Sequence, residues 1–207
     1  MPQDLVPAAI GFRVHSGWVA AVIVAGDLSS PNVIDRRRIE IADPELPGSK
    51  QPYHAGEKLP LEEAERLLQR CASSSTSLAK KAVGDCLDAA QRRGHRVFAC
   101  GILLGSGRPL PTVAAILASH ALIHTAEGEF FRNLVSDACN QHELQVIGVK
   151  EKELLGRCNA ELRMSQDRLE QHLSSIGRAL GPPWRQDEKL ATLVAWLALA
   201  TVGRTSN

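Results

Sequence analysis

Three stretches near the start of the chain, AAIGFRVHS (8–16), WVAAVIVAG (18–26) and NVIDRRRIEIAD (32–43), decide the fold. The first two are nearly continuous in Ala, Val and Ile, which is typical of strands that are covered on both faces. The third mixes charged residues with Ile39 and Ile41, so we expect it to be an edge strand. The connections HSG and GDLSSPN have turn composition. We therefore predict three consecutive antiparallel strands.

The rest of the chain alternates between strand and helix patterns. A Pro- and Gly-rich loop is followed by helical spacing, which a run of serines is predicted to divide into two helices. The predicted elements are a loop at about 43–60, helices on either side of 73–77, a strand at 95–105, a helix at 112–142, a strand at 144–149 and a C-terminal helical pair at about 164–202. This order predicts an antiparallel meander extended by two parallel strands through helical crossovers, in one domain spanning 1–207.

Composition restricts the function classes. The chain has 207 residues, of which 44% are hydrophobic, with 24 Lys+Arg against 23 Asp+Glu and a formal net charge of +1. This charge supplies no overall attraction to nucleic acid or anionic lipid. The five cysteines form no CxxC pair, so we expect reduced, buried thiols. The N-terminus lacks a secretion signal, and the apolar run 190–202 is too short to span a bilayer, so we expect a cytoplasmic protein with no membrane partner.

The C-terminal region carries the motifs of a known family. VKEKELLG (149–156) precedes DRLEQHLSSIGRALGPPWRQDEKLATLVAWLALA (167–200). With the order of elements, these segments resemble the linker, penultimate helix, Pro-containing break and final helix of RuvC-type Holliday-junction resolvases, in the ribonuclease H-like superfamily. The resemblance implies an α/β fold with a five-stranded mixed sheet flanked by helices. It also implies a symmetric homodimer.

The catalytic carboxylates of that family are mostly missing. Resolvases hold two metal ions with an Asp on the first strand, a Glu ending the fourth strand and two Asp on the last helix. The resemblance places Arg13 at the first position, Gly101 or a neighbouring apolar residue at the second, and Asp187 and Leu190 on the last helix. A guanidinium stays charged and repels cations, so we predict a degenerate site without two-metal nuclease activity. We expect Arg13 to reach solvent or to pair with a carboxylate such as Asp187.

The histidines are the other candidates for chemistry. His120 and His124 are four residues apart and Glu127 follows three later, so all three share one helix face and could ligate a metal. His15 and His54 could join them, because first-strand ends and the following loops converge at the usual site of this fold. The alternative for the helix is a partly exposed polar face. The candidate catalytic residues are His15, His54, Glu127 and Asp187, with Glu129 a further member of a rebuilt site.

Two further patterns suggest anion binding only weakly. Gly105, Ser106 and Gly107 follow a strand and precede a helix, where backbone amides attract phosphate, but the spacing fits neither standard phosphate loop and is also that of a simple turn. The arginines at 36–38 could contact a phosphate backbone, yet charges on an edge strand more often prevent edge-to-edge pairing.

These patterns favour a ribonuclease H-like binding or assembly module that needs no cofactor. One alternative is a hydrolase with a rebuilt His/Glu site, which could hold a divalent metal. The other is a structure-specific nucleic-acid binder that does not cut. We also expect a homodimer, whose interface would be the first half of the 112–142 helix unless a monomer buries that surface. The residues predicted to form this interface are Ala114, Ala115, Leu117, Ala118, Ala121, Leu122 and Ile123.

Overall fold

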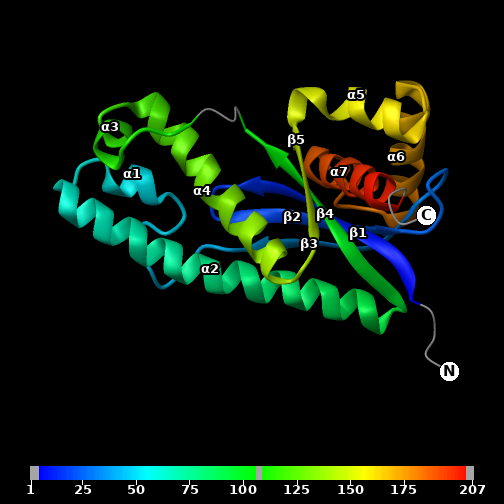
Figure 1. Ribbon diagram of the computed structural model, residues 1–207, viewed down its shortest axis with the longest axis horizontal. Helices are drawn as coiled ribbons and strands as arrows, with labels where there is room; N and C mark the ends of the chain where they lie inside the picture. The colour runs from blue at the N-terminus through cyan, green and yellow to red at the C-terminus, as the bar shows by residue number, and fades with distance from the viewer. Residues whose placement is uncertain (1–4, 106–108, 204–207) are drawn as a thin grey trace.

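The computed structural model describes residues 5–105 and 109–203, and it contains a five-stranded mixed sheet (Figure 1). The strands are β1 (Val6–His15), β2 (Trp18–Ala25), β3 (Asn32–Glu40), β4 (His95–Leu104) and β5 (Gln145–Lys150). Their order across the sheet is β3-β2-β1-β4-β5. β1 and β2, and β2 and β3, are antiparallel, whereas β4 pairs in parallel with both β1 and β5. The predicted meander, its parallel extension and the edge position of β3 are confirmed.

Helices cover both faces of this sheet (Figure 1). They are α1 (Pro52–Gly56), α2 (Leu61–Arg92), α3 (Val113–Leu117), α4 (His120–Gln141), α5 (Glu151–Leu162), α6 (Gln166–Leu180) and α7 (Gln186–Gly203). Apolar side chains of α2 and α4 form one core with the sheet, and those of α5, α6 and α7 form another on the opposite face. No helix within the two described ranges is both long enough and apolar enough to cross a membrane.

The last helix, α7, lies directly against the sheet because two glycines leave room for its backbone. A Cβ on Gly11 of β1 would lie 2.0 Å from the carbonyl oxygen of Ala191, and one on Gly101 of β4 would lie 2.2 Å from that of Val194. These two glycines are paired across β1 and β4. The close approach brings the first turn of α7 to the carboxyl end of β1, where Arg13 and His15 are located.

The serine run does not divide the helix that contains it. α2 is continuous for 32 residues, so the predicted break is wrong. Ser73 and Ser77 donate hydrogen bonds to carbonyl oxygens one turn earlier, at 3.0 and 3.2 Å, and Ser75 is buried. Hydroxyls that bond the preceding turn leave the backbone ladder intact, which explains why the helix tolerates them.

Three other boundaries differ from the prediction. The segment 43–60 contains the short helix α1, because Pro52 stands in its first turn, where no amide hydrogen is needed. The predicted helix 112–142 is two helices, α3 and α4, because Ser119 has an extended backbone. Helix α5 was not predicted, since its sequence was interpreted as a linker, and it carries the buried residues Leu154, Cys158 and Leu162.

Candidate functional site

An ion-pair network lies where α5 and α7 meet the carboxyl end of the central strand β1. We call this end of the sheet the sheet edge. The Arg13 guanidinium lies 3.1 Å from Oε2 of Glu151, and its Nε lies 3.7 Å from Oδ1 of Asp187. The two carboxylates come from the first turns of α5 and α7. All three side chains are partly exposed. The expected pairing of Arg13 with Asp187 is present, whereas no sequence pattern predicted that Glu151 would join it.

His15, the last residue of β1, extends this network. Its Nε2 lies 2.9 Å from Oδ1 of Asp187, and its ring stacks on Trp18 with centroids 4.2 Å apart. The Arg38 guanidinium covers the same indole at 3.6 Å from the ring centroid. The imidazole is therefore fixed by a carboxylate on one side and an aromatic ring on the other, at the end of β1.

The fourth strand offers no carboxylate beside Arg13. Phe12 pairs with Ile102, so the residue of β4 level with Arg13 is Leu103, which is buried against α7. Gly101 lies two residues earlier, where the backbone of α7 leaves no space for a side chain. Leu190 is also buried in the same core. Around Asp187, the sheet edge therefore combines the Arg13 guanidinium, the Glu151 carboxylate and the His15 imidazole with buried apolar side chains.

A second group of side chains, which we call the histidine cluster, consists of His54, His120 and His124. One ring nitrogen of each lies within 4.8 Å of the corresponding atoms of the other two. The Nε2 atoms of His120 and His124 are 3.1 Å apart, one turn from each other at the start of α4. His54 comes from α1, and its ring centroid lies 4.7 Å from that of His124. The region between β3 and α2, predicted as a loop, therefore delivers the third imidazole.

Glu127 lies behind the histidine cluster rather than among its rings. The side chain is almost completely buried, and its Oε2 accepts hydrogen bonds from Nδ1 of His54 at 2.8 Å and from the His54 amide at 3.2 Å. Burial raises the pKa of Glu127, and hydrogen bonds from His54 and from the Tyr53 backbone amide oppose that shift. Oε1 is buried and finds no hydrogen-bond partner in the described part of the chain.

The other predicted residues do not join the histidine cluster. Glu129 pairs with Arg132 at 3.1 Å, and a Cβ on Gly105 would contact this pair. Ser106 and Gly107 lie outside the described residues. His15, which was expected to join the histidines, belongs instead to the network around Asp187.

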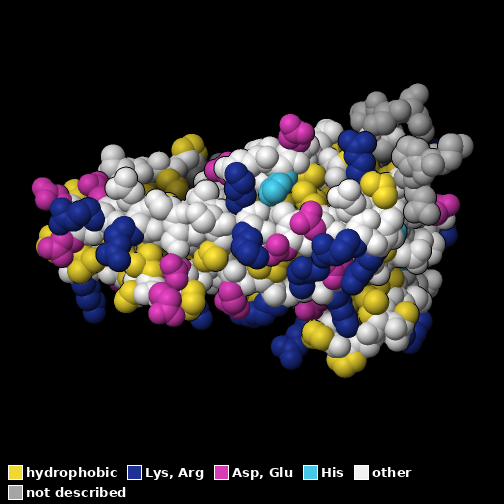
Figure 2. Space-filling model, turned by 90° about the horizontal axis from the view of Figure 1, so that it is seen from below, with side chains coloured by type: hydrophobic (Ala, Val, Ile, Leu, Met, Phe, Trp, Pro, Cys, Tyr) yellow, Lys and Arg dark blue, Asp and Glu magenta, His cyan; other side chains and the backbone are white. Residues whose placement is uncertain are grey.

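The arginines of β3 bond within the protein. Arg36 donates to the carbonyl oxygens of Leu180, the last residue of α6, at 3.1 Å and of Gly181, which follows it, at 2.9 Å. Arg37 pairs with Asp35 and Arg38 with Glu40. On the face seen in Figure 2, Lys and Arg side chains are interspersed with Asp and Glu. These arginines therefore stabilise the edge strand and its neighbours.

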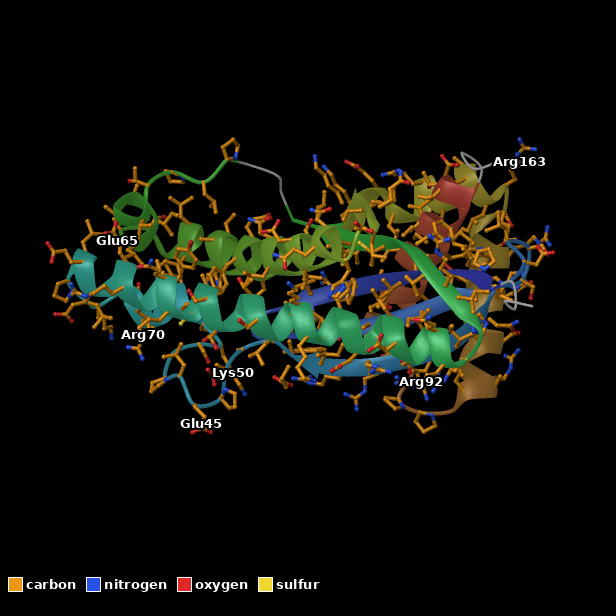
Figure 3. The ribbon with its side chains drawn as sticks, turned by 60° about the horizontal axis from the view of Figure 1, so that its bottom comes forward. Glu45, Lys50, Glu65, Arg70, Arg92 and Arg163 are labelled. Atoms are coloured by element: carbon orange, nitrogen blue, oxygen red, sulfur yellow. The ribbon has the colours of Figure 1, made fainter. Side chains whose placement is uncertain are left out.

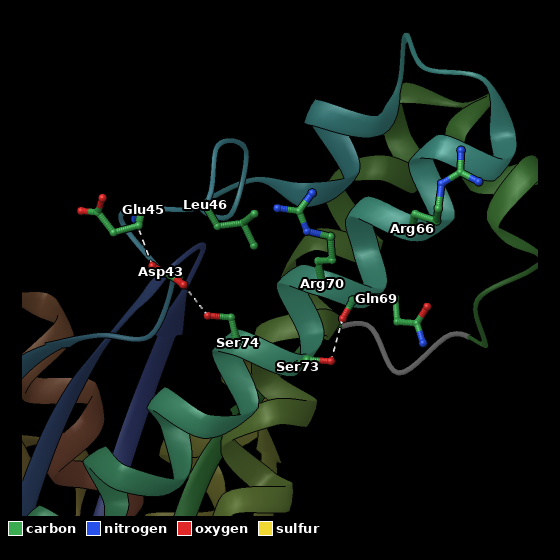
Figure 4. A pocket seen from close by; sticks show the side chains of 8 residues that line it. All are labelled: Asp43, Glu45, Leu46, Arg66, Gln69, Arg70, Ser73 and Ser74. Carbon is green, nitrogen blue, oxygen red and sulfur yellow. Dashed lines mark hydrogen bonds between the residues drawn. The ribbon is translucent and has the colours of Figure 1, made fainter.

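A surface hollow lies between the segment after β3 and the first half of α2 (Figure 4). Within it, Asp43 accepts hydrogen bonds from the Ser74 hydroxyl at 2.7 Å and from the Glu45 amide at 2.9 Å, and both lower the pKa of Asp43. Figure 3 shows Glu45 and Lys50 on the loop and Arg70 on the helix. The Asp43 contacts therefore connect the loop to α2.

Comparisons with known proteins identify the fold. No protein-family model matches the chain, and no curated protein matches it. Its structure is similar to that of Thermus thermophilus RuvC in complex with Holliday junction substrate, with a TM-score of 0.56 and 10% identity over 95% of each chain. A second T. thermophilus RuvC structure matches with a TM-score of 0.55 and 9% identity over 96% of each chain. The chain therefore has a RuvC-type, ribonuclease H-like fold.

Proposed function

We propose that this chain is a RuvC-like protein that acts by binding and does not cleave phosphodiesters with two metal ions. The observation that carries the proposal is the ion pairing of Arg13 with Glu151 and Asp187 at the sheet edge. A guanidinium remains positive at any working pH, so it neutralises the carboxylates that a metal would need.

The ligand inventory at the sheet edge supports the same proposal. Two-metal hydrolysis requires a cage of oxygen donors that holds both ions beside the attacking and leaving oxygens. Leu103 and Leu190 contribute apolar surface instead of oxygen, and Asp187 is already hydrogen-bonded to Nε2 of His15. Such a network holds β1, α5 and α7 together, which is a structural role rather than a catalytic one.

Branched nucleic acid is the ligand that the proposal tests first. One of the solved structures with this fold is a RuvC complex with Holliday junction substrate, which makes a four-way junction the natural probe. A mobility-shift titration should compare a four-way junction with a linear duplex of equal length, at increasing salt. We expect salt-dependent binding that favours the junction, without cutting. Equal affinity for the junction and the duplex, or no binding to either, would contradict junction recognition. It would favour a role in assembly as a cytoplasmic homodimer.

A second candidate function is favoured by the convergence of the histidine cluster. A hydrolase built there would use a metal-bound water held by His54, His120 and His124. Zinc-dependent hydrolysis of an activated ester or phosphodiester, lost in His124→Ala, would support this function. Absence of zinc-dependent turnover would leave binding as the function of the chain.

A further inference from the structure

We propose that His54, His120 and His124 bind one Zn²⁺ ion through their ring nitrogens. The proposal concerns a site on α1 and α4, away from the sheet edge, and it holds whether or not the site catalyses a reaction. It shares its three ligands with the second candidate function, but it concerns zinc binding alone and stands even if no zinc-dependent hydrolysis is found.

The spacing of the nitrogens fits tetrahedral zinc. Zn–N bonds of about 2.0–2.1 Å at the tetrahedral angle place two ligating nitrogens about 3.3–3.4 Å apart. The Nε2 atoms of His120 and His124 are 3.1 Å apart, and the three ligand atoms together span no more than 4.8 Å. Zinc binding would require side-chain rotations that bring all three nitrogens to bonding distance from a common point.

One carboxylate is hydrogen-bonded to a ring of the histidine cluster, and a second lies near another ring. Nδ1 of His54 is bonded to Glu127, which leaves its Nε2 for a metal. Nδ1 of His120 lies 3.9 Å from Glu57, while its Nε2 faces His124. Metal-binding histidines usually place a carboxylate or carbonyl on the nitrogen that does not bind the metal, which fixes the tautomer and makes the ring a better ligand. Glu127 is therefore a positioning residue.

The burial of Glu127 is the second observation that points to a metal. The side chain is 2% exposed, and Oε1 has no hydrogen-bond partner among the described residues. A buried carboxylate is costly unless positive charge or hydrogen-bond donors compensate it. A zinc ion on the far side of the His54 ring would supply positive charge through the imidazole.

The donor set selects the class of metal. Imidazole nitrogens suit zinc and its neighbours in the transition series, whereas Mg²⁺ prefers oxygen ligands. Three protein ligands leave a fourth tetrahedral position for water, and His120, with a side chain that is 67% exposed, gives the ion access from solvent. The site therefore differs in donor atoms from any magnesium site of a nuclease.

Equilibrium dialysis of the purified, chelator-treated protein against Zn²⁺ tests this directly. We expect one zinc per chain, and a loss of affinity of about 100-fold or more in His120→Ala and in His124→Ala, since each removes one ligand. The matched control is His142→Gln, because His142 follows the other end of α4 and bonds to the carbonyl of Lys80. This variant should bind zinc as the original chain does.

Cobalt spectroscopy and the positioning residues complete the test. Co²⁺ should give the intense visible bands of a tetrahedral ion without thiolate charge-transfer bands, since no cysteine is a ligand. Glu127→Gln should weaken zinc binding about 10- to 100-fold in protein that circular dichroism shows to be folded. If Glu127→Gln does not fold, the same measurement is made on Glu57→Gln, since Glu57 is partly exposed and lies near His120. Less than half an equivalent of zinc, or equal losses in His120→Ala and His142→Gln, would overturn the proposal.

Discussion

His15 and Asp187 are 172 residues apart in the chain, yet Nε2 of one lies 2.9 Å from Oδ1 of the other. The contact joins the end of β1 to the first turn of α7. Because the Arg13 guanidinium approaches the same carboxylate oxygen, Asp187 interacts with two basic side chains at once. Asp187, which the sequence resemblance predicted at a resolvase carboxylate position, therefore makes its contacts within the protein.

The glycines beneath α7 lead to a stability prediction. Gly11→Ala and Gly101→Ala should each destabilise the fold by about 1–3 kcal/mol, because the added methyl group would overlap backbone atoms of α7. The control is Gly156→Ala in α5, where a Cβ meets nothing within 4 Å and helix propensity should make the change neutral or stabilising. Urea denaturation measures all three, and equal midpoints would contradict the close packing of α7.

The pKa of Asp43 should respond to the helix that it contacts. Hydrogen bonds from Ser74 and from the Glu45 amide lower this pKa, so their contribution to stability is present above the ordinary carboxyl range and is lost as pH falls through the folded-state value. Ser74→Ala should raise the pKa of Asp43, as followed by carboxyl-carbon NMR. Ser73→Ala is the control, since that hydroxyl bonds to Gln69. An unchanged Asp43 titration in Ser74→Ala would refute the contact.

The thiols should be inert in the folded protein. All five cysteines are free and buried, and burial raises the pKa of Cys86 to about 11 and that of Cys158 to about 12. Since the thiolate is the reactive form, a thiol-specific reagent at pH 8 should label the native chain only slowly. Five equivalents should react after denaturation. Rapid labelling of the native protein would place a thiol in a more open environment.

The predicted homodimer can be tested on the exposed alanines of α3. Ile123 is buried and Leu122 packs beside it, so a charge at Leu122 would disturb the core as well as an interface. Ala114 and Ala115 are exposed in the monomer. Light scattering should give twice the chain mass, and Ala114→Glu should reduce it to 22.4 kDa in folded protein. A monomer before the substitution would exclude this dimer.

The order of helices and strands could be predicted, because hydrophobic periodicity and turn composition depend on residues that are close in the sequence. Continuous apolar runs predicted β1 and β2, and charges predicted the edge position of β3. The continuity of α2 was not readable, because it depends on hydroxyls such as that of Ser73 bonding to the preceding turn. Helix α5 was not predicted, because its apolar residues are buried by packing against α7, which is distant in the sequence.

The candidate sites were predictable only in part. The spacing of His120 and His124 indicated one helix face, and the resemblance to resolvases indicated Arg13 and Asp187. The contribution of His54 depends on the path of the chain between β3 and α2, which spacing does not encode. The same holds for Glu151, whose approach to Arg13 requires β5 and α5 to be in place.

The central claim is that the sheet edge does not support two-metal cleavage. The most direct measurement is incubation of the purified chain with a labelled four-way junction and with an RNA:DNA hybrid, in Mg²⁺ or Mn²⁺, alongside Asp187→Asn and Arg13→Asp. We predict no cleavage by any of the three proteins. One added carboxylate does not supply enough oxygen ligands for two metal ions, because Leu103 and Leu190 provide none. Metal-dependent cutting by the unaltered chain that disappears in Asp187→Asn would contradict the account.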